Sequence, residues 1–404
     1  MITLVSFFMA LSATPQIDLD FAGPYPVAVR DVQFTDANFG RGVIIGKVFY
    51  PATTAGVDQP LDVNGGPYPL VGFSHGWTEP VSDYASLLTH LASWGFVVAG
   101  IGTETDLWGD MQVEAKDLRS MLHWCEDESL SANSWLAQAL DYQDWGAAGH
   151  SMGGASMGYL VRDEPRISDV VMLEPYHGSF LGSSYPAFNQ FHNYNGRLMV
   201  VAGAADTTCP PSSMVKPWFD KATGTEKAVY MLIDGGGHFG ATIWPGWNGN
   251  LNGPDQARMH FRLLSAFMLS GLKHQEDRWE AFCGMSAAVE PISAESASQV
   301  PAIWMDYDAA VPSELLVGIA GDSGMNARMA YSFNTGYRST VYGTVEIDLA
   351  TASIFIRARF AANGIEQEVI NLPPTWSGTT LYLQGASIFA RSGHVSRAAS
   401  FLVP

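Results

Sequence analysis

The sequence predicts an α/β protein, in which a mainly parallel sheet flanked by helices is followed by a small β-sandwich. Three observations indicate this architecture: short apolar runs alternate with helical stretches over residues 21–288, a small polar segment occupies 289–299, and alternating apolar and polar residues fill 300–404. Strands separated by helices form parallel sheets, because each helical crossover returns the chain to the same end of the sheet. With 404 residues, the chain is long enough for two domains.

The elements of both domains can be placed along the chain. Strands of the first domain are expected at residues 43–49, 69–73, 96–101, 145–148, 169–173, 197–202 and 228–233, and helices at 83–94, 152–161 and 256–270. Residues 253–255 (Gly-Pro-Asp) are expected to cap the last helix. Residues 291–299 are small and polar, as in a linker. In the second domain, the runs 343–349 and 353–360 alternate in the manner typical of sandwich strands.

The composition argues against two classes of partner. Apolar residues make up 47% of the chain and charged residues 15%, so both domains are expected to be globular. The formal net charge of −19 repels nucleic-acid phosphates and anionic lipid headgroups. We therefore expect no nucleic-acid partner. We also expect a monomer in solution. No stretch beyond the N-terminus is long and apolar enough for a transmembrane segment.

Residues 2–13 form a short apolar run that ends in small residues, as in a signal peptide cleaved near Ala13. The alternative is a buried N-terminal segment, because no Lys or Arg precedes the run. We interpret residues 1–20 as a signal peptide and leader, which predicts a secreted or periplasmic protein. The three cysteines, Cys125, Cys209 and Cys283, allow at most one intramolecular disulfide, and no closely spaced Cys/His cluster predicts a metal site.

Ser151 has the surroundings of a nucleophile. Residues 149–153 read Gly-His-Ser-Met-Gly, with a strand expected before the serine and a helix after it. This strand–turn–helix holds a serine on a strained turn, and the two glycines leave room for the close approach of strand and helix. An overlapping Gly-x-Ser-x-Gly pattern contains Ser156, which lies inside the expected helix, so we interpret Ser156 as structural.

Two backbone N–H groups are expected to form an oxyanion hole. Met152 follows the serine at a helix N-terminus, where the helix dipole favours negative charge. Trp77 follows the strand 69–73 and the dipeptide His75-Gly76, in the position of the second donor. The alternative is that His75-Gly76 is an ordinary strand-ending turn.

A serine needs a base, and the base needs an acid to orient it. His238 follows the strand 228–233 and a run of glycines, which places it on a loop at the carboxyl end of a strand. Asp206 follows the preceding strand and is the favoured acid. Glu174, at the end of the strand 169–173, is the alternative, whereas Asp234 is too close to His238 in sequence to face it easily.

Seven stretches in a fixed order carry a family resemblance: 73–78, 91–98, 149–154, 174–177, 203–207, 237–239 and 277–283. In these, the segment 25–283 resembles the cutinase-like and polyester-hydrolase branch of bacterial α/β-hydrolases, which includes poly(ethylene terephthalate) (PET) hydrolases, and more loosely the platelet-activating-factor acetylhydrolases. The resemblance implies the α/β-hydrolase fold and a serine carboxylic-ester hydrolase without a cofactor. It also implies Ser151, Asp206 and His238 as the triad and Trp77 and Met152 as the oxyanion donors.

The resemblance also indicates substrate contacts. Trp77 stands where the family commonly carries Tyr, and Tyr176, just before His177, stands where it usually carries Trp. Together with Phe239, Trp244 and Trp247, these side chains are expected to line an apolar cleft for ester groups of lipids or polyesters, the alternative being core packing.

Several features depart from the family pattern. The acid loop is one residue shorter, and residues 241–255 are longer and more aromatic than expected. Cys283 matches the family's C-terminal cysteine but lacks its later partner, so its pairing with Cys209, which is marginally favoured, or with Cys125 stays open. An acyltransferase and an inactive binding protein are the other functions on this fold. The C-terminal domain is expected either to attach the enzyme to a polymer or cell surface or to serve as a spacer.

Overall fold

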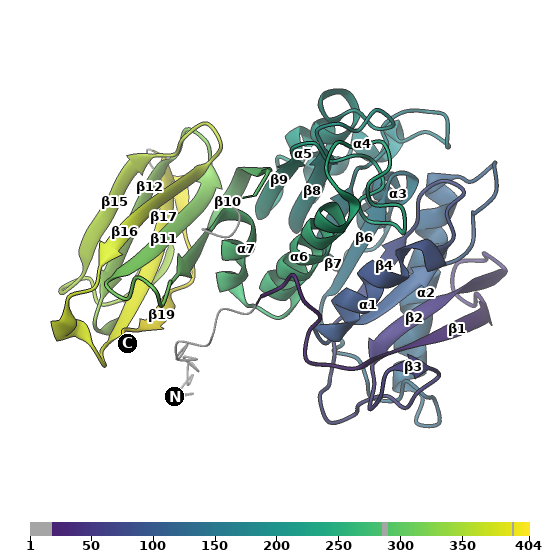
Figure 1. Ribbon diagram of the computed structural model, residues 1–404, viewed down its shortest axis with the longest axis horizontal. Coiled ribbons are helices and arrows are strands. Elements are labelled where there is room, and N and C mark those ends of the chain that lie inside the picture. Colours follow the sequence, from purple (N-terminus) through teal and green to yellow (C-terminus); the bar gives the residue numbers. More distant parts are fainter. Residues whose placement is uncertain (1–17, 285–289, 390–391) are drawn as a thin grey trace. The chain divides into compact units, whose positions relative to one another are not determined.

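The computed structural model describes residues 18–284, 290–389 and 392–404 (Figure 1). They form two compact units, one mainly from residues 19–282 and the other mainly from residues 295–404. The predicted signal-peptide core at residues 2–13 lies outside the described residues.

The first unit is built on a mainly parallel sheet (Figure 1). Its spatial order is β9-β8-β7-β6-β4-β5-β2-β1-β3. The strands from β9 to β5 run parallel to their neighbours, whereas β5–β2 and β2–β1 are antiparallel. The bounds are β1 (Val27–Thr35), β2 (Val43–Pro51), β3 (Gly56–Val57), β4 (Leu70–Ser74), β5 (Val97–Ile101), β6 (Trp145–His150), β7 (Ile167–Leu173), β8 (Arg197–Gly203) and β9 (Lys227–Ile233). The predicted fold class is confirmed.

Helices cover the sheet: α1 packs against α6, and α2 packs against α3. The bounds are α1 (Ala85–Ser93), α2 (Met111–Leu130), α3 (Met152–Asp163), α4 (Tyr185–Phe188), α5 (Lys216–Lys221), α6 (Gly253–Leu272) and α7 (Glu280–Cys283). The cap of α6 is Asn252, whose side chain accepts a hydrogen bond from the N–H of Asp255, one residue before the predicted cap. Because β4 to β9 are covered on both faces, they are almost wholly buried, which explains their continuous apolar runs.

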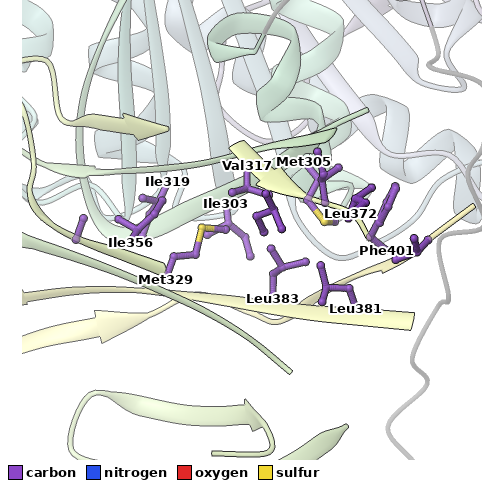
Figure 2. Packing of buried hydrophobic residues seen from close by; sticks show 14 of the residues in the cluster. Ile303, Met305, Val317, Ile319, Met329, Ile356, Leu372, Leu381, Leu383 and Phe401 are labelled. Atoms are coloured by element: carbon purple, nitrogen blue, oxygen red, sulfur yellow. The ribbon is translucent and has the colours of Figure 1, made fainter. Parts of the chain in front are cut away.

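In its described residues, the second unit consists of two facing antiparallel sheets and a separate two-stranded sheet formed by β13 and β14. One of the facing sheets has the order β16-β11-β10, and the other has the order β15-β12-β17, with β18 and β19 both paired to β17. The bounds are β10 (Ile292–Asp306), β11 (Glu314–Asp322), β12 (Asn326–Ser332), β13 (Thr335–Thr340), β14 (Gly343–Ile347), β15 (Ser353–Arg359), β16 (Ile365–Asn371), β17 (Thr380–Phe389), β18 (Ser392–Val395) and β19 (Ala399–Leu402). Figure 2 shows the core between the sheets, with Ile303 and Ile319 from the first facing Met329 and Leu383 from the second.

The boundary between the two units falls inside the predicted linker 289–299, but from Ile292 onward the chain belongs to strand β10 rather than to a loop. Ser296 and Ser298 are both buried, and their hydroxyl groups are hydrogen-bonded at 3.0 Å. Ala297 pairs with Asp322 of β11. Small polar side chains therefore occupy a strand here because its backbone is paired and its alternate residues face inward, which composition alone cannot reveal.

Cys125, Cys209 and Cys283 are all buried and free, so neither disulfide considered for Cys283 is formed. Burial raises the pKa of each thiol above its usual value, which keeps the three sulfurs protonated. None of the helices in the described part of the chain is long and apolar enough to cross a membrane.

Candidate active site

Ser151, His238 and Asp206 meet at one edge of the sheet of the first unit. They follow β6, β9 and β8, whose carboxyl ends lie at that edge because the three strands run parallel. Nε2 of His238 lies 3.0 Å from Oγ of Ser151, and Nδ1 of His238 lies 2.7 Å from Oδ2 of Asp206. All three side chains are buried. This geometry allows the imidazole to take the hydroxyl proton while the carboxylate holds the imidazole in place.

The turn that carries Ser151 is strained, as the motif predicts. Ser151 has φ 53° and ψ −111°, and it immediately precedes α3. A Cβ on Gly149 would collide with the carbonyl oxygen of Gly153, and a Cβ on Gly153 would collide with that of Ser74. Both glycines are therefore required by the close approach of β6, α3 and β4.

Asp206 is oriented by its own loop. Its Oδ1 accepts hydrogen bonds from the backbone N–H groups of Thr208, at 2.7 Å, and Cys209, at 2.9 Å. The other oxygen is thereby left for His238. The alternative acid, Glu174, lies elsewhere: its Oε1 is 2.9 Å from Nε2 of His260, and both side chains are fully buried. The structure therefore does not bring Glu174 to His238.

The loop that carries His238 is fixed from two sides. Gln256 of α6 accepts from the N–H of Gly237 at 3.1 Å and donates to its carbonyl oxygen at 2.7 Å. His150, the residue before the nucleophile, lies with Nε2 2.8 Å from the carbonyl oxygen of His238. The glycine run before His238 is thus held rather than flexible.

Of the two expected oxyanion donors, Met152 directly follows Ser151 and Trp77 directly follows Gly76. Their neighbours are already engaged: Gly153 donates its N–H to the carbonyl oxygen of His75 at 3.0 Å, and Gly76 donates to the hydroxyl of Tyr84 at 2.8 Å. Within residues 18–284, no hydrogen bond uses the N–H of Trp77 or Met152. Both N–H groups are therefore without a hydrogen-bond partner in that range, and their role as oxyanion donors stays a prediction.

Three of the predicted cleft residues, Phe239, Trp247 and Trp77, have rings that contact other aromatic rings. Phe239 packs edge-on against His238, with centroids 5.0 Å apart, and stacks on the largely exposed Trp247 at 5.1 Å. Trp77 is half-buried and packs edge-on against the exposed ring of Phe180 at 5.4 Å. These rings can offer apolar surface to a substrate.

Two further predicted cleft residues, Tyr176 and Trp244, differ in burial and in contacts. Tyr176 is half-buried and anchored to the nucleophile turn, because its N–H donates to the carbonyl oxygen of Ser151 at 2.9 Å. Trp244 is 55% exposed and makes no ring contact in the described part of the first unit. The loop after His238 therefore presents two tryptophans to solvent, Trp244 and Trp247.

His177 is part of a packed aromatic group. Its ring lies 4.3 Å from that of Phe188 and 5.7 Å from that of Trp218, and Nδ1 is 2.9 Å from Oγ of Ser184. Burial lowers the pKa of His177, so the ring is neutral at pH 7. Its contact with a substrate stays a prediction.

Sequence reasoning missed three residues behind the nucleophile, namely Glu79, Tyr84 and His150. Their only local signal is that Glu79 follows His75-Gly76 by three residues and that His150 lies inside the serine motif. Among the residues with described positions, no group of three or more His, Cys, Asp and Glu side chains could hold a metal ion.

Comparisons with known proteins all find similarity to PET hydrolase-like proteins and cutinases. A family model described as "PETase: PET hydrolase-like" matches residues 18–274. Cutinase 1 of Thermobifida cellulosilytica is 26% identical over 223 residues, which cover 55% of this chain and 74% of that protein. A cutinase of Thermobifida fusca is 26% identical, covering 55% of this chain and 65% of that protein. A bis(hydroxyethyl) terephthalate hydrolase of Streptomyces coelicolor is 27% identical, covering 54% and 61%.

Proposed function

The chain belongs to the PET hydrolase-like family, and from that premise we propose that it is a secreted serine esterase of cutinase or polyesterase type that works through an acyl-enzyme on Ser151. Membership confirms the predicted resemblance, the α/β-hydrolase fold and the enzyme class, carboxylic ester hydrolase. The serine mechanism, the secretion and the substrate are the proposal.

The observation that carries the mechanism is the chain of contacts from Ser151 through His238 to Asp206, at 3.0 and 2.7 Å. Oγ of Ser151 attacks the ester carbonyl carbon while its proton passes to Nε2 of His238. The carbonyl oxygen becomes an oxyanion, which the N–H groups of Trp77 and Met152 stabilise. The bond to the alcohol oxygen then breaks, and the alcohol leaves with the proton from His238.

Deacylation repeats the same steps with water. His238 takes a proton from a water molecule, which attacks the acyl carbon. The bond to Oγ breaks, the proton returns to Ser151, and a carboxylic acid is released. No redox change occurs in either half, and every proton that His238 accepts it also donates.

The substrate class is proposed from the surroundings of the serine. Phe239, Trp247 and Trp77 present rings beside the site, and such rings favour apolar acyl groups or aromatic diesters over charged substrates. Two of the relatives are named cutinases and one a terephthalate-ester hydrolase, which supports a polyester substrate. Short-chain lipid esters are the alternative.

The mechanism is tested with the variants Ser151→Ala and Ser156→Ala on p-nitrophenyl esters from acetate to palmitate, with amorphous PET film alongside. Ser156 is a matched control, because it lies inside α3 and its hydroxyl donates to the carbonyl oxygen of Gly153 at 2.7 Å. We expect Ser151→Ala to be inactive and Ser156→Ala to be active. The chain-length optimum and the release of soluble products from film then separate short-chain esterase, lipase and polyesterase. Equal activity of both variants would remove Ser151 from the mechanism.

The second unit is proposed to attach the enzyme to a polymer or a cell surface, and the alternative is a spacer. It has a hydrophobic core of its own, which supports independent folding. A chain that ends near residue 288 should keep its activity on soluble esters. It should lose binding to insoluble material if the second unit attaches the enzyme, and should keep that binding if the unit is a spacer. The monomeric state stays a prediction.

A further inference from the structure

Directly behind the nucleophile lies a buried polar cluster that the proposed acyl transfer does not use. It consists of Glu79, after the oxyanion loop, Tyr84, at the end of the 3₁₀ helix η1 (Val81–Tyr84), and His150, the last residue of β6. Tyr84 and His150 are fully buried, and the side chain of Glu79 is 14% exposed. A buried carboxylate and imidazole are costly unless they are paired, so their contacts define their role.

The contacts of the cluster reach both sides of the proposed active site. On one side, Nε2 of His150 lies 2.8 Å from the carbonyl oxygen of His238, so this nitrogen must donate. On the other side, the hydroxyl of Tyr84 accepts the N–H of Gly76, the residue before Trp77, at 2.8 Å. His150 is joined to the other two residues through Nδ1, which lies 2.7 Å from the hydroxyl of Tyr84 and 3.2 Å from Oε2 of Glu79.

The hydrogen-bond directions and the pKa directions of the cluster agree on its charge. The hydroxyl of Tyr84 has one proton, which it donates to Oε2 of Glu79. Nδ1 of His150 must then donate as well, which makes His150 an imidazolium paired with the Glu79 carboxylate. Burial alone would lower the pKa of His150, but the hydrogen bond and charge of Glu79 raise it above the usual value. Burial would likewise raise the pKa of Glu79, yet His150 and Tyr84 bring it below its usual value.

We propose that Glu79, Tyr84 and His150 are positioning residues, which hold the oxyanion loop and the His238 loop at a fixed separation around Ser151. This inference rests on the proposed triad. The ring of His150 also lies 4.8 Å from that of His238, so the cluster supports the base through its carbonyl oxygen and through ring contact. Acyl transfer needs the base and the oxyanion donors in register with one carbonyl group, and a misplacement of about 1 Å can cost about 100-fold in rate.

A purely structural role makes a different prediction. If the cluster only fills a buried space, its loss should lower stability and leave the turnover of correctly folded molecules unchanged. If it positions the catalytic groups, its loss should lower kcat per folded molecule. KM should hardly change in that case, because none of the three side chains belongs to the aromatic cleft.

The test uses the full-length protein with Glu79→Gln, Tyr84→Phe and the double variant. Glu79→Gln keeps the size and removes the charge, and Tyr84→Phe keeps the ring and removes the hydroxyl that binds Gly76. A fluorophosphonate ester that reacts covalently with the active serine counts the competent sites, so kcat is expressed per site and misfolded molecules are excluded. Asp83→Asn is the matched control, because it removes one carboxylate from η1 next to Tyr84 whose side chain is not among the hydrogen-bond partners of Glu79, Tyr84 or His150.

We expect each single variant to lower kcat on p-nitrophenyl butyrate by about 10- to 100-fold with KM within about twofold, and the control to keep wild-type kinetics. The double variant should lose no more than the worse single variant, because residues that act as a unit are not additive. Wild-type kcat per site in both single variants overturns the proposal, as does a control that loses as much as they do. Activity of Ser151→Ala would instead overturn the proposed triad, so the two failures are distinguishable.

Discussion

Replacing Asp206 with asparagine should move the proton of the neutral His238 ring from Nδ1 to Nε2 without changing the shape of the site. In the protein, Oδ1 of Asp206 accepts two backbone N–H groups, from Thr208 and Cys209, while Oδ2 faces Nδ1 of His238. An asparagine has one acceptor oxygen and one NH₂ group. Its oxygen is best used facing the two N–H donors, so its NH₂ group faces the imidazole. Nδ1 must then accept, and Nε2 carries a proton directed at Ser151, where a base is needed.

The expected loss of kcat follows from the free-energy cost of the opposite amide orientation. In that orientation the amide oxygen faces His238, and the enzyme would stay active. That orientation sets the NH₂ group against two backbone N–H donors and leaves them unpaired. Each buried unpaired donor costs about 1–3 kcal/mol, so the productive orientation is disfavoured by about 2–6 kcal/mol. At about 1.4 kcal/mol per tenfold, kcat should fall by roughly 30- to 20,000-fold. The loss of the carboxylate charge that stabilises the imidazolium favours the upper end of this range.

The assay is steady-state hydrolysis of p-nitrophenyl butyrate by the wild type, Asp206→Asn and the control Asp234→Asn. Asp234 is an exposed aspartate that also precedes His238, so the control makes the same chemical change outside the proposed triad. The melting temperature and fluorophosphonate labelling show whether the site is folded. An Asp206→Asn enzyme that keeps more than one tenth of wild-type kcat would refute the tautomer argument and would make another group the acid.

Three further predictions concern the cleft, the second core and pH. Trp247→Ala removes an exposed ring that stacks beside Phe239 and that the proposed cleft offers to a substrate; a lost aromatic contact with the substrate is worth about 0.5–1.5 kcal/mol, so KM for an aromatic ester should rise roughly 2- to 12-fold with kcat unchanged in steady-state kinetics. Leu383→Ala opens a cavity in the fully buried core of the second unit and should lower its unfolding free energy in urea by about 2–5 kcal/mol, with ester hydrolysis unchanged. Burial lowers the pKa of His90 to about 4, from 6.5 when unfolded. The unfolded chain therefore binds the proton first, and stability to urea should fall as pH drops from about 6.5 to about 4, less so in His90→Gln.

Much of the first unit could be predicted because parallel strands covered on both faces must be apolar throughout. The expected strands at 145–148 and 197–202 lie within β6 and β8, and each ends where a site residue follows. Once Ser151 was assigned to the end of β6, the parallel topology required His238 and Asp206 to come from the ends of other strands. The short apolar runs and the strained serine turn are therefore sufficient to predict most of the candidate site residues.

The elements that were missed depend on partners distant in sequence. Helix α2 buries Glu114 and Asp117, which interrupts the apolar pattern by which helices are recognised. Asp117 can be buried because Arg41, far away in the sequence, pairs with it. A local signal did exist, since Asp110 caps α2 by accepting from the N–H groups of Gln112 and Val113. The Glu79–Tyr84–His150 cluster was invisible for the same reason, because its contacts span 66 and 71 residues.

In the described part of the first unit, several histidines are buried beside a carboxylate, and a carboxylate beside a histidine therefore does not identify an active site. His260 binds Glu174 through Nε2, and its Nδ1 lies 2.8 Å from the carbonyl oxygen of Gln256. His150 lies beside Glu79, and its Nε2 faces the carbonyl oxygen of His238. In both rings the second nitrogen faces an oxygen that can only accept, so it must keep its proton and cannot act as a base. The ring of His238 differs, because its second nitrogen faces the hydroxyl of Ser151, which has a proton to give.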